Sequence, residues 1–213
     1  DIGLAFDGDA DRCFLIDEVG GLVNPSALTA LIAARELKAN PGASIIYNLI
    51  SSKAVPEVIA ENGGVGIRSR VGHSYIKSMM AETGAVFGGE HSGHFYFNDF
   101  WRADSGMLAA LYALAELMGS NSSLSELLKP YNRYISSGEI NTKVKNVTKS
   151  ISRVRDKYHG KYQVDELDGL TITASTWWFN LRPSNTEPLL RLNVEADTEK
   201  EMIKIRDAVL ALI

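Results

Sequence analysis

The chain has 213 residues, 45% hydrophobic and 23% charged, a composition typical of a globular protein with sizeable buried cores. Its formal net charge of −4 disfavours nonspecific nucleic-acid binding, and no apolar run is long enough to span a membrane. The single cysteine, Cys13, excludes a disulfide framework and points to a cytoplasmic location. The chain begins at Asp1, without a signal peptide, directly before a predicted strand, so we expect a piece of a longer protein.

The first part of the chain alternates predicted strands and helices. Helices are expected from Pro25, after Ser51–Ser52, over 72–83 and over 103–118, because their apolar residues recur at helical spacing. The predicted strands cover 2–6, 13–16, 44–49, 65–69 and 85–88. This order predicts an α/β fold with a mixed, mostly parallel sheet and flanking helices.

The second part follows a polar break at 119–123 and Pro130, and its pattern differs. It predicts an α+β domain with an antiparallel sheet and two helices. The expected strands cover 135–144, 170–174, 177–181 and 189–196, and the helices cover 147–158 and 200–213. In the strand with Trp177-Trp178, one ring should point inward and the other outward. We therefore expect boundaries at 1–19 (end of one domain), 20–129 (an α/β domain) and 130–213 (an α+β domain).

The first chemical motif is the turn Asp7-Gly8-Asp9-Ala10-Asp11-Arg12. A tight turn, with Gly8 free to adopt positive φ, would converge three carboxylates on a hard divalent cation. The guanidinium of Arg12 suits a phosphate beside that metal. Two alternatives are an acidic surface turn and an EF-hand loop. The EF-hand is disfavoured because Arg12 replaces the glycine of its sixth position and the flanks are strand-like.

A second polar loop, Gly89–His94, places Glu90, Ser92 and His94 within five positions. Glu90 and Ser92 suit sugar hydroxyls, and His94 can transfer a proton at neutral pH. His91 is expected to be solvated, and the whole loop could be a solvated turn instead.

A third loop, between two predicted strands, contains Arg182, Ser184, Asn185 and Thr186. The arginine can bind phosphate through paired hydrogen bonds, and the three polar residues add donors. The alternative is a polar hairpin turn. Arg191 could support this loop or face solvent.

His73 and Lys77 lie four residues apart on the predicted helix over 72–83. They could hold an anionic sugar phosphate. We favour the alternative that they form a solvated face.

Together, in this order and spacing, the three loops resemble the α-D-phosphohexomutases, a family that includes phosphomannomutase and phosphoglucomutase. The first looks like the family's magnesium loop, the second like its sugar loop and the third like its phosphate loop. The stretch 88–111 looks most like bacterial phosphomannomutases. The resemblance covers nearly the whole chain and corresponds to the end of domain 2, domain 3 and domain 4.

The resemblance implies interconversion of hexose 6-phosphate and hexose 1-phosphate through a phosphoserine and a hexose 1,6-bisphosphate. That serine belongs to an N-terminal domain with no counterpart here, so the chain alone should be inactive and its partners would be those domains and a phosphorylated hexose. The implied magnesium ligands are Asp7, Asp9 and Asp11. The implied catalytic residues are Arg12 and His94. The implied substrate-binding residues are His73, Glu90, Ser92, Arg182, Ser184, Asn185 and Thr186.

One departure from the family pattern is Ile50, which stands where many relatives have a basic residue, with Lys53 three positions later. The chain could instead be a stand-alone metal-binding or phosphosugar-binding module. A magnesium-dependent sugar phosphatase would need a further nucleophile or activated water that the sequence does not supply. The preference for mannose or glucose stays open.

Overall fold

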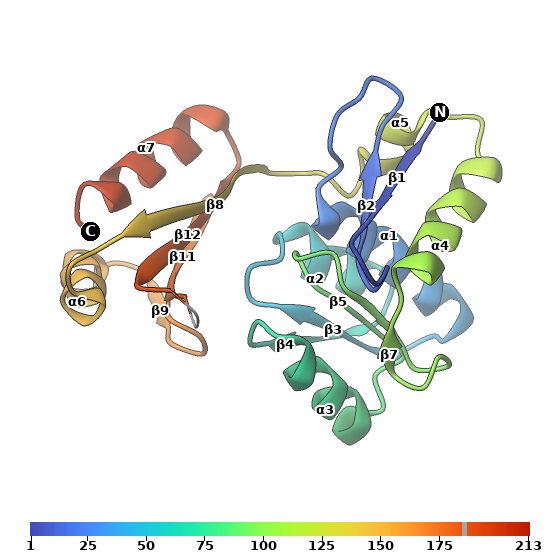
Figure 1. Ribbon diagram of the computed structural model, residues 1–213, viewed down its shortest axis with the longest axis horizontal. Helices are drawn as coiled ribbons and strands as arrows, with labels where there is room; N and C mark the ends of the chain where they lie inside the picture. The colour runs from blue at the N-terminus through green and yellow to red at the C-terminus, as the bar shows by residue number, and fades with distance from the viewer. Residues whose placement is uncertain (185–186) are drawn as a thin grey trace. The chain divides into compact units, whose positions relative to one another are not determined.

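The computed structural model describes residues 1–184 and 187–213 and divides into two compact units, Asp1–Arg133 and Tyr134–Ile213 (Figure 1). Within the described residues, no helix is both long and apolar enough to cross a membrane.

The first unit is built on a five-stranded sheet with the order β4-β3-β5-β6-β7. Strand β3 pairs in parallel with β4 and β5, whereas β5–β6 and β6–β7 are antiparallel. The strands are β3 (Ser44–Asn48), β4 (Val65–Ser69), β5 (Phe87–Gly89), β6 (Phe95–Phe97) and β7 (Ala103–Asp104). The predicted mixed sheet with flanking helices is therefore confirmed.

Helices cover both faces of this sheet. On one face, Ile45 and Phe87 belong to a large core with residues of four helices, and on the other face Ile46 and Tyr96 pack against Ile76. Figure 1 shows α3 below the sheet, apart from the other helices. The four helices of the large core are α1 (Pro25–Ala39), α2 (Ala54–Glu61), α4 (Gly106–Met118) and α5 (Leu124–Leu128), and the opposite face carries α3 (His73–Thr83).

The starts of α4 and α2 differ from prediction. The expected helix over 103–118 begins only at Gly106, because Ser105 is the N-cap and its Oγ accepts the N–H of Leu108 at 3.2 Å. The residues before it form β7 instead. The N-cap of α2 is Lys53, although the Ser52 Oγ still accepts the N–H of Ala54 at 3.2 Å.

The N-terminal strands β1 (Gly3–Phe6) and β2 (Cys13–Ile16) form an antiparallel pair, with the acidic turn as their connection. Cys13 is completely buried in the large core. Its N–H donates to the carbonyl oxygen of Gly93 at 3.0 Å, which ties this hairpin to the loop after β5.

The second unit has an antiparallel sheet with the order β8-β12-β11-β10-β9. Its helices, α6 (Val147–Tyr158) and α7 (Glu199–Leu210), pack on the face that carries the cross-strand pairs Phe179–Val194 and Leu181–Leu192. The strands are β8 (Ile135–Lys143), β9 (Gln163–Asp165), β10 (Leu170–Thr173), β11 (Trp177–Pro183) and β12 (Leu189–Ala196). The predicted α+β architecture is confirmed, with β9 as an additional strand.

Two details of β11 differ from expectation. The strand continues through Pro183, so Arg182 lies within it and not in the following loop. The Trp177 ring belongs to the helix-covered core, but Trp178 on the other face is also buried. Its Nε1–H donates to Glu195 Oε1 at 2.8 Å, so the indole nitrogen has a partner there.

Candidate functional site

The acidic turn brings its three carboxylates together. Asp7, Asp9 and Asp11 each offer an oxygen, and these oxygens lie within 4.8 Å of one another. The turn closes through the N–H of Ala10, which donates to the carbonyl oxygen of Asp7 at 3.2 Å. The left-handed residue is Ala10 (φ 59°) and not Gly8, so the expected role of that glycine was wrong.

Arg12 stabilises the charge of this turn. Its backbone N–H donates to Asp7 Oδ1 at 3.2 Å, and its Nε lies 3.2 Å from Asp7 Oδ2. Partial burial acts to raise the pKa of Asp7, but these two contacts bring it below its usual value. The pKa of Asp11 is raised, first by burial and then by the charges of Asp7, Asp9 and Asp104, while His94 opposes the shift.

The donor set fits a hard divalent cation. All ligand atoms available in the turn are carboxylate oxygens, which Mg²⁺ prefers. Among the described residues, Asp11 Oδ1 is buried without a hydrogen-bond partner, as expected for an atom that a cation would satisfy. The residues present therefore suit the predicted metal.

The sugar loop predicted around Gly89–His94 lies directly against the acidic turn. Arg12 and His94 form an antiparallel bridge, next to the bond from Cys13 to Gly93. Gly93 has φ +89°, and a Cβ there would lie 2.9 Å from the Phe14 ring, so both its conformation and its space require glycine. The structure thus brings together two motifs that are about 80 residues apart in the sequence.

His94 is oriented by a carboxylate that the sequence analysis did not assign. Its Nδ1 lies 2.9 Å from Asp104 Oδ2 and 3.7 Å from Asp11 Oδ2. The other oxygen of Asp104 lies 2.7 Å from Lys77 Nζ. Burial acts to raise the pKa of Asp104, but the bonds from Lys77 and His94 bring it below its usual value. Lys77 is thus an ion-pair partner and not part of a solvated face.

Glu90 is buried, with 1% of its surface exposed. The Tyr96 hydroxyl donates to its Oε1 at 2.7 Å, whereas Asn48 Nδ2 and the Gly72 N–H donate to its Oε2 at 3.2 and 3.1 Å. Burial, followed by the charge of Glu90, raises the pKa of Tyr96, so its hydroxyl remains a donor. The carboxylate therefore links the sugar loop to β3 and to the start of α3.

The remaining residues of the first unit differ in exposure. Ser92 is half-buried, and His73 is exposed at the first position of α3. His91 was expected to be solvated but is held by the protein, because its Nδ1 lies 3.0 Å from Ser26 Oγ. Ile50 is buried, and Lys53 is half-buried.

In the second unit, Arg182 has only 8% of its side chain exposed. Its Nη2 lies 2.8 Å from Glu139 Oε2, and Glu139 Oε1 lies 3.3 Å from Arg191 Nη1. Arg191 Nη2 also approaches Ser184 Oγ at 3.4 Å, so it contacts the start of the predicted phosphate loop. The predicted phosphate ligands Asn185 and Thr186 lie outside the described residues.

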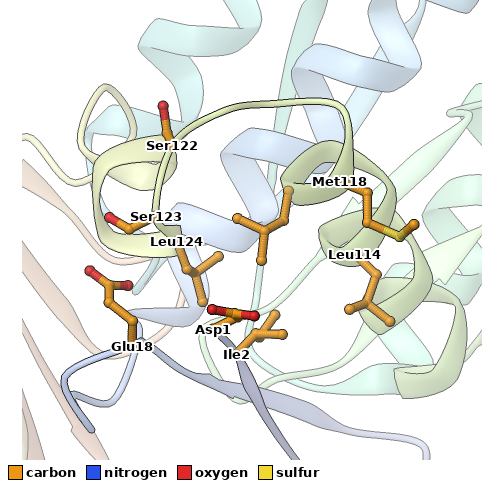
Figure 2. Close-up of a pocket in the computed structure, with 9 residues that line it drawn as sticks. Asp1, Ile2, Glu18, Leu114, Met118, Ser122, Ser123 and Leu124 are labelled. Atoms are coloured by element: carbon orange, nitrogen blue, oxygen red, sulfur yellow. The ribbon is translucent and has the colours of Figure 1, made fainter.

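A pocket of about 470 Å³ lies where the N-terminal residues meet α4 and α5 (Figure 2). Leu114, Leu117 and Met118 contribute much of its wall. The carboxylate at its rim, Glu18, is bound by the N–H of Ser125 at 3.1 Å and by its hydroxyl. The side chains that line this pocket include no Lys, Arg or His, so we take the acidic turn and its neighbours as the candidate site.

Comparison with known proteins agrees with this geometry. Residues 24–134 match the domain described as phosphoglucomutase/phosphomannomutase, alpha/beta/alpha domain III, and residues 139–212 match the C-terminal domain of the same family. The chain belongs to the phosphoglucomutase/phosphomannomutase family. The predicted resemblance to the C-terminal part of the α-D-phosphohexomutases is therefore confirmed.

Individual relatives give the same assignment. A phosphomannomutase from Methanocaldococcus jannaschii is 48% identical over 202 residues, which is 95% of this chain and 45% of the relative. A crystal structure of a phosphoglucomutase/phosphomannomutase family protein from Burkholderia thailandensis has a TM-score of 0.88 and 32% identity over 100% of this chain and 46% of that chain. The chain thus spans about half the length of the relatives that it matches.

Two structures of Aspergillus fumigatus N-acetylphosphoglucosamine mutase share the fold. One, an S69A form in complex with glucose 1,6-bisphosphate, has a TM-score of 0.71, 15% identity and coverage of 100% of this chain and 48% of that chain. The other, in complex with GlcNAc-6P and magnesium, has a TM-score of 0.75, 13% identity and coverage of 100% and 52%.

Proposed function

We propose that this chain supplies the metal, sugar and phosphate sites of a phosphohexomutase that interconverts hexose 6-phosphate and hexose 1-phosphate, with mannose phosphate as the favoured substrate. The transferred phosphoryl group would come from a phosphoserine outside these 213 residues and pass through a hexose 1,6-bisphosphate. The Arg12–His94 bridge carries the proposal, because it places three converging carboxylates beside an imidazole held by Asp104.

Each group of the first unit has a role in this reaction. Asp7, Asp9 and Asp11 would hold Mg²⁺, which neutralises charge on the transferring phosphoryl group when it is bound. Arg12 lies at the end of the same turn, where its guanidinium can leave Asp7 for a phosphate oxygen. Because 45% of the Arg12 side chain is exposed, this exchange needs little rearrangement of the protein.

His94 is the group that moves a proton. Its Nδ1–H donates to the Asp104 carboxylate, which leaves Nε2 as the nitrogen that takes the proton of a sugar hydroxyl or returns it. Lys77 keeps the Asp104 carboxylate ionised and thus keeps the imidazole in this orientation. Glu90 and Ser92 would contact sugar hydroxyls, with His73 at the edge of the site.

The second unit would hold the phosphate that is not reacting, through Arg182 near the end of β11 and through the residues Ser184, Asn185 and Thr186 that follow the strand in the sequence. Support for this role comes from the chemistry of Arg182, because a guanidinium can hold a phosphate through two parallel hydrogen bonds. Proton transfer and phosphate binding would thus be divided between the two units.

The deciding experiment is a coupled mutase assay on the full-length protein with mannose 1-phosphate and glucose 1-phosphate. We expect turnover of both, faster with mannose 1-phosphate, in the presence of Mg²⁺ and a hexose 1,6-bisphosphate. The 213-residue chain alone, which contains no phosphoserine loop, should stay at background. An inactive full-length protein that still binds Mg²⁺ and phosphosugar would favour a binding module instead.

A further inference from the structure

The sheet of the second unit carries a row of polar side chains on the face opposite its helices. Arg182 on β11 and Arg191 on β12 are direct cross-strand partners, and so are Asn180 and Asn193. Glu139 on β8 pairs with Asn193 and therefore lies on the same face. Two guanidinium groups thus stand side by side on neighbouring strands.

This arrangement is unfavourable unless a carboxylate separates the two cations, because like charges directly opposite each other destabilise a strand pair. Burial lowers the pKa of Arg182 and the charge of Arg191 lowers it further, whereas Glu139 opposes both effects. The Glu139 carboxylate contacts both guanidinium groups, with one oxygen on each, at 2.8 and 3.3 Å. A single carboxylate therefore contacts both guanidinium groups, while Asp168 adds a second negative charge near Arg182.

The cluster is also incompletely satisfied. Among the described residues, the Nε groups of Arg182 and Arg191 are buried without a hydrogen-bond partner. Such groups are rare in folded proteins and need an explanation other than stability. Arg191 further contacts Ser184, so the same side chain links Glu139 to the loop after β11.

We propose that Glu139 is a positioning residue of the phosphate site: it holds Arg182 and Arg191 side by side, so that the Arg182 fork faces the phosphate of the bound sugar. The proposal rests on the proposed function and names a residue that its motifs do not include. A guanidinium is planar with its donors in a fixed fork, so a carboxylate on one edge fixes where the other donors point.

A variant without this carboxylate distinguishes positioning of the two arginines by Glu139 from long-range electrostatic attraction of the anion. Glu139→Gln makes the unit more positive, so long-range attraction alone predicts tighter binding of an anion. Positioning predicts the opposite: the two guanidinium groups repel each other, and affinity for inorganic phosphate and mannose 1-phosphate falls roughly tenfold. Glu139→Asp keeps the charge but not the reach to both arginines, and it should recover part of the loss.

The matched control is Glu166→Gln. Glu166 is an exposed carboxylate of the same unit that pairs with Arg155, so this variant makes the same charge change away from the cluster. Titration calorimetry on the 213-residue chain should give wild-type affinity for Glu166→Gln and weaker affinity for Glu139→Gln. Arg182→Ala serves as the reference for complete loss of binding of inorganic phosphate and mannose 1-phosphate.

Each outcome decides the proposal. Unchanged or tighter binding by folded Glu139→Gln overturns it, and so does a wild-type chain that binds neither phosphate nor mannose 1-phosphate. If Glu139→Gln unfolds, Arg191→Lys takes its place, and undiminished binding by that variant overturns the proposal. Weaker phosphate binding by Glu139→Gln, together with a full-length protein that lacks mutase activity, supports Glu139 as a positioning residue while refuting the proposed function.

Discussion

Replacing Asp104 by Asn tests whether this carboxylate sets the protonation pattern of His94. In the wild-type chain, one oxygen of Asp104 faces Lys77 Nζ at 2.7 Å and the other faces His94 Nδ1 at 2.9 Å. Lysine can only donate, so the single oxygen of an Asn side chain must turn toward Lys77. The amide NH₂ then faces His94 Nδ1, which becomes an acceptor, and the imidazole proton moves to Nε2.

The expected magnitudes follow from this geometry. With a proton on Nε2, His94 can no longer take one from a sugar hydroxyl, so kcat of the full-length protein should fall about 10²–10⁴-fold, the usual contribution of a general acid–base group. Stability should fall by only about 1–2 kcal/mol, since Lys77 is 41% exposed and can return to water. Nitrogen NMR of the imidazole in the 213-residue chain reads the tautomer directly.

The double variant Lys77→Met/Asp104→Asn makes the test sharper. Without Lys77 the amide is free to turn, present its oxygen to His94 Nδ1 and restore the original tautomer. Part of the lost kcat should therefore return, although a second residue has been removed. If the double variant is as slow as Asp104→Asn, or if Asp104→Asn keeps kcat within about threefold of wild type, the tautomer reasoning is refuted.

Three further predictions concern the metal loop and the fold around it. Asp9→Ala should abolish the heat of Mg²⁺ binding in titration calorimetry, and equal heats for both proteins would remove the turn from the metal site. Gly106→Ala places a Cβ 2.5 Å from the carbonyl oxygen of Arg12, so the free energy of unfolding, measured with denaturant, should fall by about 1–3 kcal/mol. An unchanged free energy of unfolding would contradict this close packing of Gly106 against Arg12. The pKa of Glu18 is lowered to about 2 from 4.5, first by the Ser125 hydroxyl. The ionised Glu18 therefore stabilises the fold above pH 4.5, and this contribution is lost as the pH falls toward 2. In Glu18→Gln the thermal midpoint should fall less between pH 4.5 and 2 than in the wild type. Identical pH profiles of the two proteins would contradict this role of Glu18.

Much of the fold could be predicted because its signals are local. The amphipathic pattern predicted α6 over 147–158 without error, and the strand predicted over 189–196 has the bounds of β12. The prediction for Gly8, in contrast, was wrong, because glycine permits positive φ but does not require it. In this turn Ala10 has the positive φ instead. The predicted start of α4 was wrong because the pairing of 103–104 with β6 depends on residues elsewhere in the sheet, which a local pattern does not show.

The candidate site could be predicted only in part, for a related reason. Residues inside the three motifs carry their own pattern, whereas the carboxylates that contact them lie outside these motifs. Asp104 reaches His94 across ten positions, and Glu139 reaches Arg182 across 43. The signal that could have found Asp104 is an acidic residue directly before the N-cap Ser105, which places it at the start of a helix next to the site.

The hydrogen bonds of Glu90 bear on how the proposed site could be rigid and still accept a sugar in two orientations. An ionised carboxylate has about four acceptor positions, and three donors of the protein already occupy Glu90. In the proposed function a sugar hydroxyl would use the one that remains, while Tyr96 and Asn48 keep the carboxylate fixed. Because only 1% of Glu90 is exposed, the atoms that cover the carboxylate would have to move aside for this contact. One fixed acceptor can receive a hydroxyl from a sugar bound in either direction, whereas a fully complementary site would favour one of them. The third donor, the Gly72 N–H, directly precedes His73, so the carboxylate proposed to receive the sugar is also bonded to the start of α3.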